Sequence, residues 1–150
     1  MTTERFQRYV LIAQRFGART VLFQDAAARR LELTATQLEC FQLVRNEGPL
    51  TASNLARETG LTQASLSVIV DKLVARAFLS REQDRTDRRR WLLRANADAV
   101  AQVDAVYVAH ASRTADLLND YSDEELNAAL HFMERLTDEL RLTTIELSER

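Results

Sequence analysis

The sequence predicts a mainly helical protein. Only three glycines and one proline interrupt its 150 residues, and these residue types most often end helices and form turns. Alanine, leucine, arginine and glutamate, all good helix formers, are abundant. Apolar residues recur at three- and four-residue spacing over long stretches, which is the period of an amphipathic helix. A chain of this length is large enough to bury a core of its own.

The first element is expected to be one long helix from Thr3 to about Leu31. Its apolar residues recur along one face of such a helix. They are Phe6, Tyr9, Val10, Ala13, Phe16, Phe23, Ala26, Ala27 and Leu31. Gly17 lies in the middle and marks a kink or a close approach by another helix.

A second helix is expected to begin at Thr34. Thr34 and Gln37 have the spacing of a capping box, in which the two side chains satisfy free backbone N–H groups. The residues expected to face inward are Leu38, Phe41 and Val44. Gly48–Pro49 ends this helix.

The next stretch has the punctuation of a helix-turn-helix. A short helix opens at Thr51 and ends at Gly60, and Thr62 caps the helix that follows. One face of this later helix is apolar, with Leu66, Ile69, Val70, Leu73 and Ala77. The opposite face carries Ala64, Ser65, Ser67, Val68, Asp71 and Lys72. Such small or polar side chains suit a helix that enters the major groove of DNA, or an ordinary amphipathic surface helix.

Two strand-like runs, Phe78–Gln83 and Arg90–Arg94, flank a charged turn and predict a β-hairpin. A hairpin directly after a helix-turn-helix makes a winged helix. Between Arg76 and Arg94 lie seven arginines and three acidic residues, whereas residues 111–150 carry four arginines and ten acidic residues. The basic segment suits a phosphate backbone, and a solvated, salt-bridged hairpin is the alternative.

The last third predicts two helices, about Ala97–Asn119 and Ser122–Ser148. Asn96 is positioned to cap the first, and Ser122 with Glu125 forms a second capping box. The apolar stripe of the last helix comprises Leu126, Leu130, Met133, Leu136, Leu140 and Ile145. Such a stripe needs a partner surface, which is either the first helix of the same chain or a second copy.

The order and spacing of several short motifs resemble the MarR family of bacterial transcriptional regulators. The motifs are Leu33–Gln37, Pro49–Thr51, Leu55–Ala56, Gly60–Thr62, Ile69–Leu73, Arg81 and Asp87–Arg89. The resemblance implies one MarR-like domain over residues 1–150. Residues 33–96 would form the winged helix-turn-helix, and residues 1–32 and 97–150 would form the helices of a dimerisation region.

The resemblance also implies which residues meet DNA. The recognition helix would run from Thr62 to Lys72, the hairpin would act as a wing, and Asp87 would orient the wing arginines through a charge-assisted bond. The expected DNA contacts are Thr62, Gln63, Ala64, Ser65, Ser67, Val68, Lys72, Arg85, Arg88 and Arg89. Two places depart from the family pattern: Ala77 replaces a usual glycine, and Ala95–Ala99 replaces a usual Leu-Thr-x-x-Gly.

A small aromatic or phenolic ligand is expected between the dimer helices and the DNA-binding lobes. The expected lining is Phe6, Tyr9, Phe16 and Phe41, with Arg15 among the nearby arginines that could meet a carboxylate. The alternative is that these aromatic residues form the packed core between the first and second helices.

Other classes of protein find little support in the sequence. It has no glycine-rich phosphate loop, no paired-histidine metal motif and no recognisable nucleophile elbow, so we expect no enzyme, no cofactor and no metal. Cys40, the single cysteine, cannot form an intramolecular disulfide and is expected to be buried and inert. No apolar stretch is long enough to cross a membrane and residues 1–8 do not resemble a signal peptide, so a cytoplasmic location is expected.

Together these features predict a DNA-binding transcriptional regulator. We expect a homodimeric, ligand-responsive repressor that binds pseudo-palindromic operators in double-stranded DNA. Two alternatives stay open. One is a winged-helix module that binds another protein, and the other is a ligand or redox sensor that acts without DNA.

Overall fold

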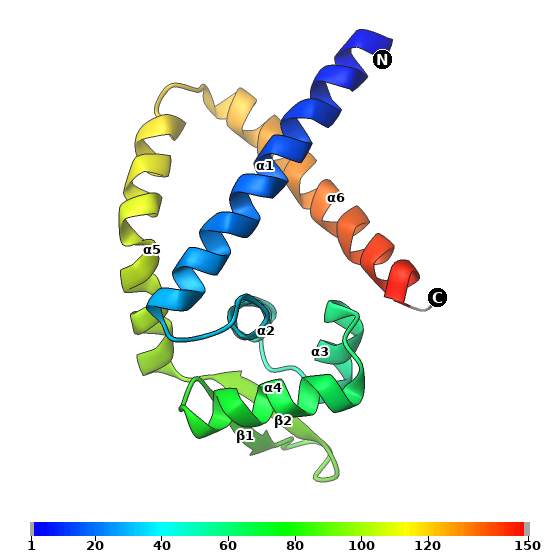
Figure 1. Cartoon of the computed structure of the whole chain (residues 1–150), viewed down its shortest axis with the longest axis vertical. Coiled ribbons are helices and arrows are strands. Elements are labelled where there is room, and N and C mark those ends of the chain that lie inside the picture. Colours follow the sequence, from blue (N-terminus) through cyan, green and yellow to red (C-terminus); the bar gives the residue numbers. More distant parts are fainter. Residues whose placement is uncertain (1, 149–150) are drawn as a thin grey trace.

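The computed structural model describes residues 2–148 as a mainly helical chain with one two-stranded antiparallel sheet. The elements are α1 (Thr3–Arg30), α2 (Ala35–Glu47), α3 (Ala52–Thr59), α4 (Gln63–Ala75), β1 (Leu79–Gln83), β2 (Trp91–Ala95), α5 (Ala97–Leu118) and α6 (Asp123–Ser148). Figure 1 shows α2, α3, α4 and the hairpin gathered in one lobe, from which α1, α5 and α6 extend. The predicted winged helix with long flanking helices is confirmed.

Local hydrogen bonds explain where the helices begin. Thr34 Oγ1 accepts from the Gln37 N–H at 3.2 Å, and Gln37 Oε1 accepts from the Thr34 N–H at 2.9 Å, so the predicted capping box is formed. Thr62 caps α4 as predicted, and Thr51, at the predicted start of α3, caps that helix. Ser122 Oγ accepts from the Glu125 N–H at 3.3 Å and starts α6.

Asn96 occupies the N-cap position of α5, but the prediction that its side chain caps this helix is wrong. Its Nδ2 donates to Ala77 O at 2.7 Å, and its N–H donates to Phe78 O at 3.0 Å. The side chain therefore ties the start of α5 to the turn that precedes β1.

Two helices end at a left-handed residue that is not glycine. Glu32 follows α1 with φ +55°, and Ala77 follows α4 with φ +57°. At the second turn the Ala77 N–H donates to Val74 O at 3.0 Å and the Phe78 N–H to Leu73 O at 2.8 Å, which is a Schellman motif. Ala77 therefore lies outside α4 and is exposed, so the prediction that it extends the apolar stripe of that helix is wrong.

The hydrophobic core lies inside the lobe and between the lobe and the adjoining ends of α1 and α5. Its largest fully buried side chains are Phe41, Leu38, Leu55, Leu66, Leu73, Leu79, Val44, Val70 and Val103. Phe41 and Phe78 meet edge to face, with ring centroids 5.6 Å apart. The inward face of α4 and the inward face of α2 therefore pack against each other and against the hairpin, as the apolar periodicity of both helices predicts.

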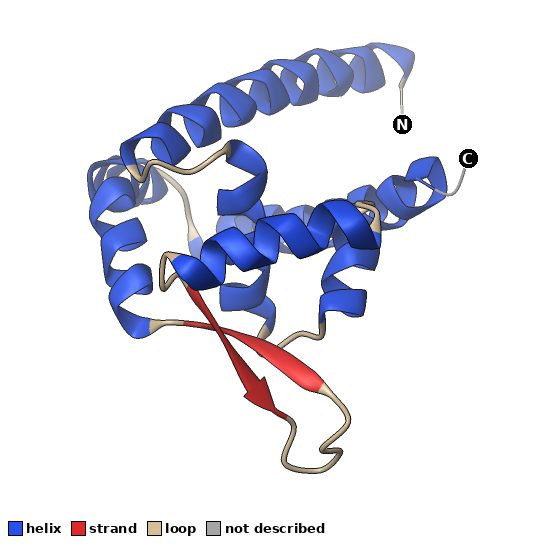
Figure 2. Cartoon of the chain, turned by 60° about the horizontal axis from the view of Figure 1, so that its bottom comes forward, coloured by secondary structure: helices blue, strands red, loops and turns tan. Residues whose placement is uncertain are grey.

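The hairpin is fixed to the lobe by its register and by a third segment. Leu79 pairs with Ala95 at the base and Gln83 with Trp91 near the loop. Leu50, just before α3, exchanges backbone hydrogen bonds of 3.2 and 2.7 Å with Leu93. Figure 2 shows the loop between the strands projecting beyond the helices.

The terminal helices leave much apolar surface uncovered. None of the described residues of α6 is buried. Helices α1 and α6 cross (Figure 1), and the Tyr9 ring meets the Phe132 ring edge-on with centroids 5.8 Å apart. The exposed large apolar residues on α1, α5 and α6 include Leu11, Ile12, Phe16, Val21, Leu22, Val108, Leu117, Leu118, Leu130, Phe132, Met133, Leu140, Leu142 and Leu147.

Candidate nucleic-acid interface

The outer face of α4 is open to solvent from its first turn. The exposed residues on this face and at its N-cap are Thr62, Gln63, Ala64, Ser65, Ser67, Val68, Asp71 and Lys72. Thr62 Oγ1 accepts from the Ser65 N–H at 3.2 Å and donates to Ser65 Oγ at 3.0 Å. The Ser65 hydroxyl therefore accepts a hydrogen bond from Thr62. The proton of the Ser65 hydroxyl is left to donate to an outside partner.

The hairpin and α4 are joined on their exposed sides by an ion pair. Arg81 on β1 donates to the Asp71 carboxylate on α4 at 2.6 Å. Both side chains are partly exposed, so the pair contributes modestly to stability. Its geometric effect is to hold the predicted wing in one position relative to the predicted recognition helix.

The loop between the strands is ordered by its own aspartates. The Asp84 carboxylate accepts from the Thr86 hydroxyl at 2.7 Å and the Thr86 N–H at 2.8 Å. These two bonds lower the pKa of Asp84 below its usual value. Gln83 Nε2 donates to Arg88 O at 2.9 Å and closes the loop from the other side.

Asp87 orients the wing in a different way from the one predicted. Its carboxylate accepts from the Arg89 backbone N–H at 3.0 Å, and its carbonyl accepts from the Arg90 N–H at 2.9 Å. The prediction that it holds a guanidinium through a charge-assisted bond is therefore corrected. Asp87 fixes the direction of the backbone, and the arginine side chains extend from that backbone.

The seven arginines of the basic segment divide into two groups. Arg76, Arg81 and Arg94 each pair with a carboxylate. The other four, Arg85, Arg88, Arg89 and Arg90, lie in the exposed loop and have no carboxylate partner within 4 Å among residues 2–148. Within this segment, the arginines without a carboxylate partner are therefore concentrated in the loop.

Arg76 has a structural role that its place in the basic segment does not reveal. Its Nη2 donates to Leu31 O at 3.1 Å and pairs with Glu32 at 3.4 Å, so it binds the end of α1. Its guanidinium also lies 5.5 Å from the centroid of the Phe78 ring. The sequence places Arg76 at the C-terminal end of α4, where a cation interacts favourably with the helix dipole, but it does not reveal the contact with α1.

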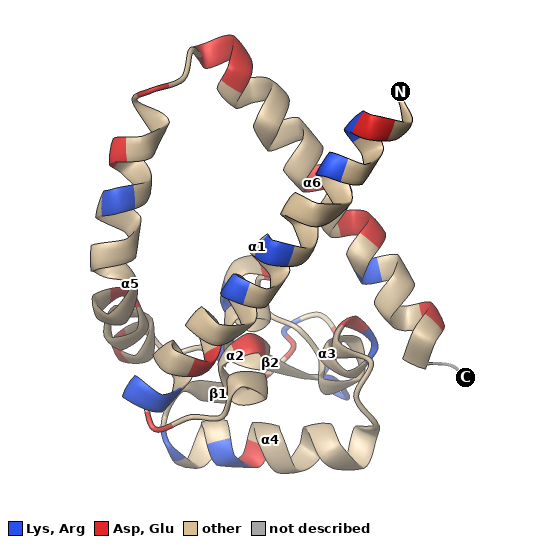
Figure 3. Ribbon diagram, turned by 45° about the horizontal axis from the view of Figure 1, so that its top comes forward, with Lys and Arg blue, Asp and Glu red and all other residues tan. Residues whose placement is uncertain are grey.

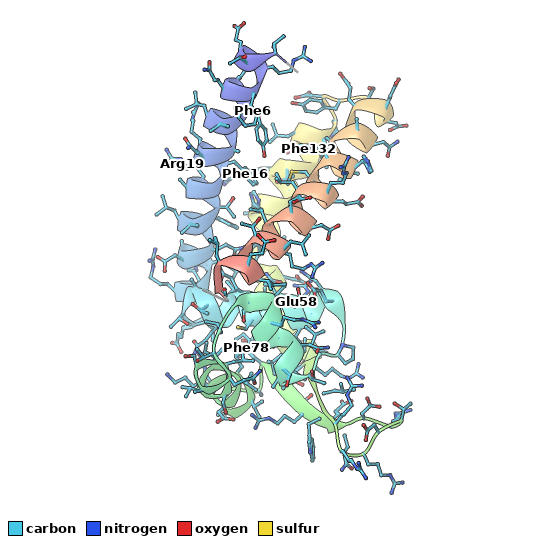
Figure 4. The ribbon with its side chains drawn as sticks, turned by 90° about the vertical axis from the view of Figure 1, so that its right-hand side faces the viewer. Phe6, Phe16, Arg19, Glu58, Phe78 and Phe132 are labelled. Carbon is cyan, nitrogen blue, oxygen red and sulfur yellow. The ribbon has the colours of Figure 1, made fainter. Side chains whose placement is uncertain are left out.

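The predicted ligand-pocket residues are not brought together within the chain. Phe41 is fully buried in the lobe against Phe78, whereas Phe6 and Phe16 on α1 are 49% and 60% exposed. Figure 4 shows Phe6 and Phe16 far from Phe78, and Phe132 on the neighbouring α6. Tyr9 contacts Phe6 and Phe132, and Arg15 is exposed. Phe41 is therefore a core residue, and the others belong to the surface of the terminal helices.

A different cavity lies where the terminal helices meet the lobe. It has a volume of about 400 Å³ and is lined from α1, α2, α3 and α6. Its polar lining includes Gln24, Glu39, Asn46, Glu58 and Thr144. The Glu58 side chain is only 11% exposed and lies 3.8 Å from Arg141 of α6. This cavity lies at the junction where a ligand site was predicted, but none of the predicted lining residues lines it.

Cys40 is fully buried on α2 and borders the same cavity. Burial, together with the neighbouring Glu39 charge, raises the pKa of its thiol to about 11. The thiolate is the reactive form, so this position is unfavourable for oxidation or metal binding at neutral pH.

Within residues 2–148 no three His, Cys, Asp or Glu side chains gather where a metal ion could bind. None of the described helices combines the length and apolarity that crossing a membrane requires.

Comparison with known proteins finds similarity to transcriptional regulators of the helix-turn-helix type. The MarR family model matches residues 33–91. The chain is 33% identical over 129 residues to the uncharacterized HTH-type transcriptional regulator YcgE of Bacillus subtilis, covering 86% of this chain and 84% of that one. It is 28% identical over 96 residues to the HTH-type transcriptional repressor NicR of Pseudomonas putida, covering 64% and 60% of the two chains.

Among solved structures, the fold is similar to that of Streptococcus pneumoniae FabT in complex with DNA. The TM-score is 0.68 at 14% sequence identity, and the match covers 90% of this chain and 96% of that one. At this identity the similarity establishes the fold alone.

Proposed function

This chain belongs to the MarR family of transcriptional regulators, which are not enzymes, and we propose that it is a homodimeric, ligand-responsive repressor of transcription that binds pseudo-palindromic DNA. The observation that carries the proposal is the pairing of two exposed features on one side of the lobe. One is the outer face of α4, and the other is the loop with four unpaired arginines. The Arg81–Asp71 ion pair holds the two in register.

The chemistry of these surfaces suits the two grooves of duplex DNA. The small side chains on the first turns of α4 allow the helix to enter the major groove, where the hydroxyls of Ser65 and Ser67 can meet base edges. The arginine loop can reach the phosphates or the narrow minor groove beside it. The acidic pI of about 5.7 does not oppose this, because the negative charge lies elsewhere.

The dimer is proposed from the terminal helices. They expose many large apolar side chains, and a second copy would bury them. Figure 3 shows mostly basic charged segments on α1 and recurrent acidic segments on α6, so the two helices are complementary in charge as well. A two-fold dimer presents two recognition helices to half-sites about one helical turn apart.

The ligand is proposed to bind in the junction cavity of about 400 Å³. A molecule wedged between the terminal helices and the lobe would change the separation of the two recognition helices. Glu39 and Glu58 line the cavity, so they favour a phenolic ligand that donates hydrogen bonds over an aromatic acid. A coupling of about 1 to 3 kcal/mol would weaken DNA binding roughly 5- to 150-fold.

The DNA-binding proposal is tested by selecting bound duplexes from a random library and by two variants. Selected sites should be inverted repeats. Arg89→Ala should weaken binding and reduce the slope of log K against log salt by about one unit. Ser65→Ala should instead change the preference at particular bases. Arg113→Ala, an exposed arginine on α5, serves as the control for charge.

Three results would contradict the proposal. Selected sites without dyad symmetry would refute the dimeric reading, and an unchanged salt slope for Arg89→Ala would refute the wing. If replacing Val68 abolishes function while replacing the loop arginines does not, the protein is better described as a protein-binding module. For the ligand, titration of phenols by calorimetry with and without DNA is decisive, because an effector must bind with different affinities in the two titrations.

A further inference from the structure

The geometry points to Trp91 as a further DNA-contacting residue. We propose that its indole ring packs on the sugar–phosphate backbone between the groove that receives α4 and the groove that receives the hairpin loop. Trp91 is the only tryptophan in the chain, and its side chain is 55% exposed at the start of β2. The inference rests on the proposed DNA-binding function and adds to it a contact that carries no sequence information.

The register of the hairpin places Trp91 on the side of the sheet that faces the helices of the lobe. Directly paired residues of an antiparallel ladder project from the same face, and alternate residues along a strand share that face. Trp91 pairs with Gln83, and Leu93 pairs with Arg81. Leu93 is buried in the core and Arg81 binds Asp71 of α4, so this face is turned toward the helices of the lobe, with β1 beside α4 and β2 beside α2 and α3.

Trp91 lies one step beyond the edge of the core on this face. It is two residues from Leu93, which corresponds to about 7 Å along a strand. The core ends at Leu93, and the loop with the unpaired arginines ends at Arg90, directly before Trp91. The indole therefore stands at the rim of the lobe, directly beside the arginine loop. A DNA strand held by both α4 and the loop would pass along this rim.

The chemistry of the indole fits a nucleic-acid backbone. Its flat apolar face can cover a deoxyribose ring, and its N–H group, which is a donor only, can bind a phosphate oxygen. Arg89 and Arg90 precede it in the chain and bring the polyanion to this position. Removing the large apolar surface of the indole from water lowers the free energy, and contact with DNA would bury this surface.

The experiment uses the tryptophan fluorescence of the full-length protein, excited at a wavelength that tyrosine does not absorb, so that the signal reports on Trp91 alone. The probe is a fluorescently labelled 30-base-pair duplex of mixed sequence at low salt, because the proposed contact does not depend on sequence. Anisotropy of the label measures binding, and acrylamide quenching measures the accessibility of Trp91. We expect saturating duplex to reduce the quenching constant at least threefold.

Variants separate contact from structure. Trp91→Ala should raise Kd about tenfold per half-site, which corresponds to roughly 60 Å² of apolar surface no longer buried against DNA. Trp91→Phe keeps one aromatic ring but loses the N–H group and part of the apolar surface, so its Kd should lie between those of the wild type and Trp91→Ala. Tyr121→Ala removes an aromatic residue of similar exposure, 58%, in the turn between α5 and α6, and should leave Kd unchanged when both proteins are compared in the same oligomeric state. Circular dichroism checks that each variant folds.

The outcomes are distinguishable. If the duplex binds but the quenching of Trp91 does not change, the contact is refuted while the DNA-binding function stands. If Trp91→Ala weakens binding without protection of the indole in the wild type, the residue has a structural role and the proposal is also refuted. Protection of Trp91 by a protein partner and not by DNA would refute it as well. If no duplex raises the anisotropy, the proposed function fails, and this contact fails with it.

Discussion

Replacing Ala77 by glycine is expected to stabilise the folded protein. Ala77 is the residue after α4 and has φ +57°, a conformation in which its Cβ crowds the following carbonyl. The turn cannot relax to negative φ, because two backbone bonds hold it. These are Ala77 N–H to Val74 O at 3.0 Å and Phe78 N–H to Leu73 O at 2.8 Å. Both bonds are made by the backbone, so glycine preserves them.

The size of the effect follows from two opposing terms. A left-handed L-residue costs about 1 to 2 kcal/mol, and glycine removes this cost. Glycine also makes the unfolded chain more flexible, which costs roughly 0.5 to 1 kcal/mol. Ala77 is exposed, so no buried methyl contact is lost. The net gain should be about 1 kcal/mol per chain, or roughly 2 to 4 °C in Tm for a chain of this size.

Urea unfolding followed by circular dichroism measures this difference. The midpoint should rise with an unchanged m value. The matched control is Ala101→Gly, an exposed alanine inside α5, which should lose about 1 kcal/mol because glycine is a poor helix former. All chains are compared at one protomer concentration, since dimer formation would make stability depend on it.

Replacing alanine by glycine is therefore expected to raise the free energy of unfolding at position 77 and to lower it at position 101. If Ala77→Gly leaves the midpoint unchanged or lowers it while Ala101→Gly behaves as stated, the assigned cost of the left-handed turn is wrong. The hydrogen bond from Asn96 to the Ala77 carbonyl survives in either variant, so it cannot explain a difference.

Three further predictions concern other positions. Gly60→Ala should lower the free energy of unfolding by at least about 1 to 2 kcal/mol in urea, because Gly60 has φ +67° and a Cβ there would lie 2.0 Å from a serine oxygen of α6. Asp87→Ala should weaken DNA binding several-fold in gel shifts, whereas Asp87→Asn, which retains the acceptor oxygen, should weaken it less; equal losses would contradict this. Peroxide should leave the DNA affinity of wild type and Cys40→Ala alike, because with a pKa of about 11 only about one thiol in a thousand is ionised at pH 8; a loss confined to wild type would reveal a thiol switch.

The sequence by itself determined the positions of the helices and the hairpin. Helix starts depend on hydrogen bonds between residues three apart, so Thr34, Thr51, Thr62 and Ser122 mark them without reference to the rest of the chain. The buried face of α4 follows in the same way from apolar periodicity, because only one face of a helix can meet a core. The residues of α4 outside this apolar pattern form its exposed face, which carries the candidate DNA contacts.

The tertiary structure decided which partners those residues meet. Asn96 has a sequence position suited to capping, yet the turn at Ala77 offers its amide a carbonyl at 2.7 Å. Phe41 and Phe6 have similar helical spacing, but one faces the lobe and the other lies on a terminal helix that the lobe does not cover. The face of the sheet on which Trp91 lies follows only from the strand register, which places it on the same face as the buried Leu93. Periodicity states that a face is apolar, whereas the packing of distant segments determines what covers it.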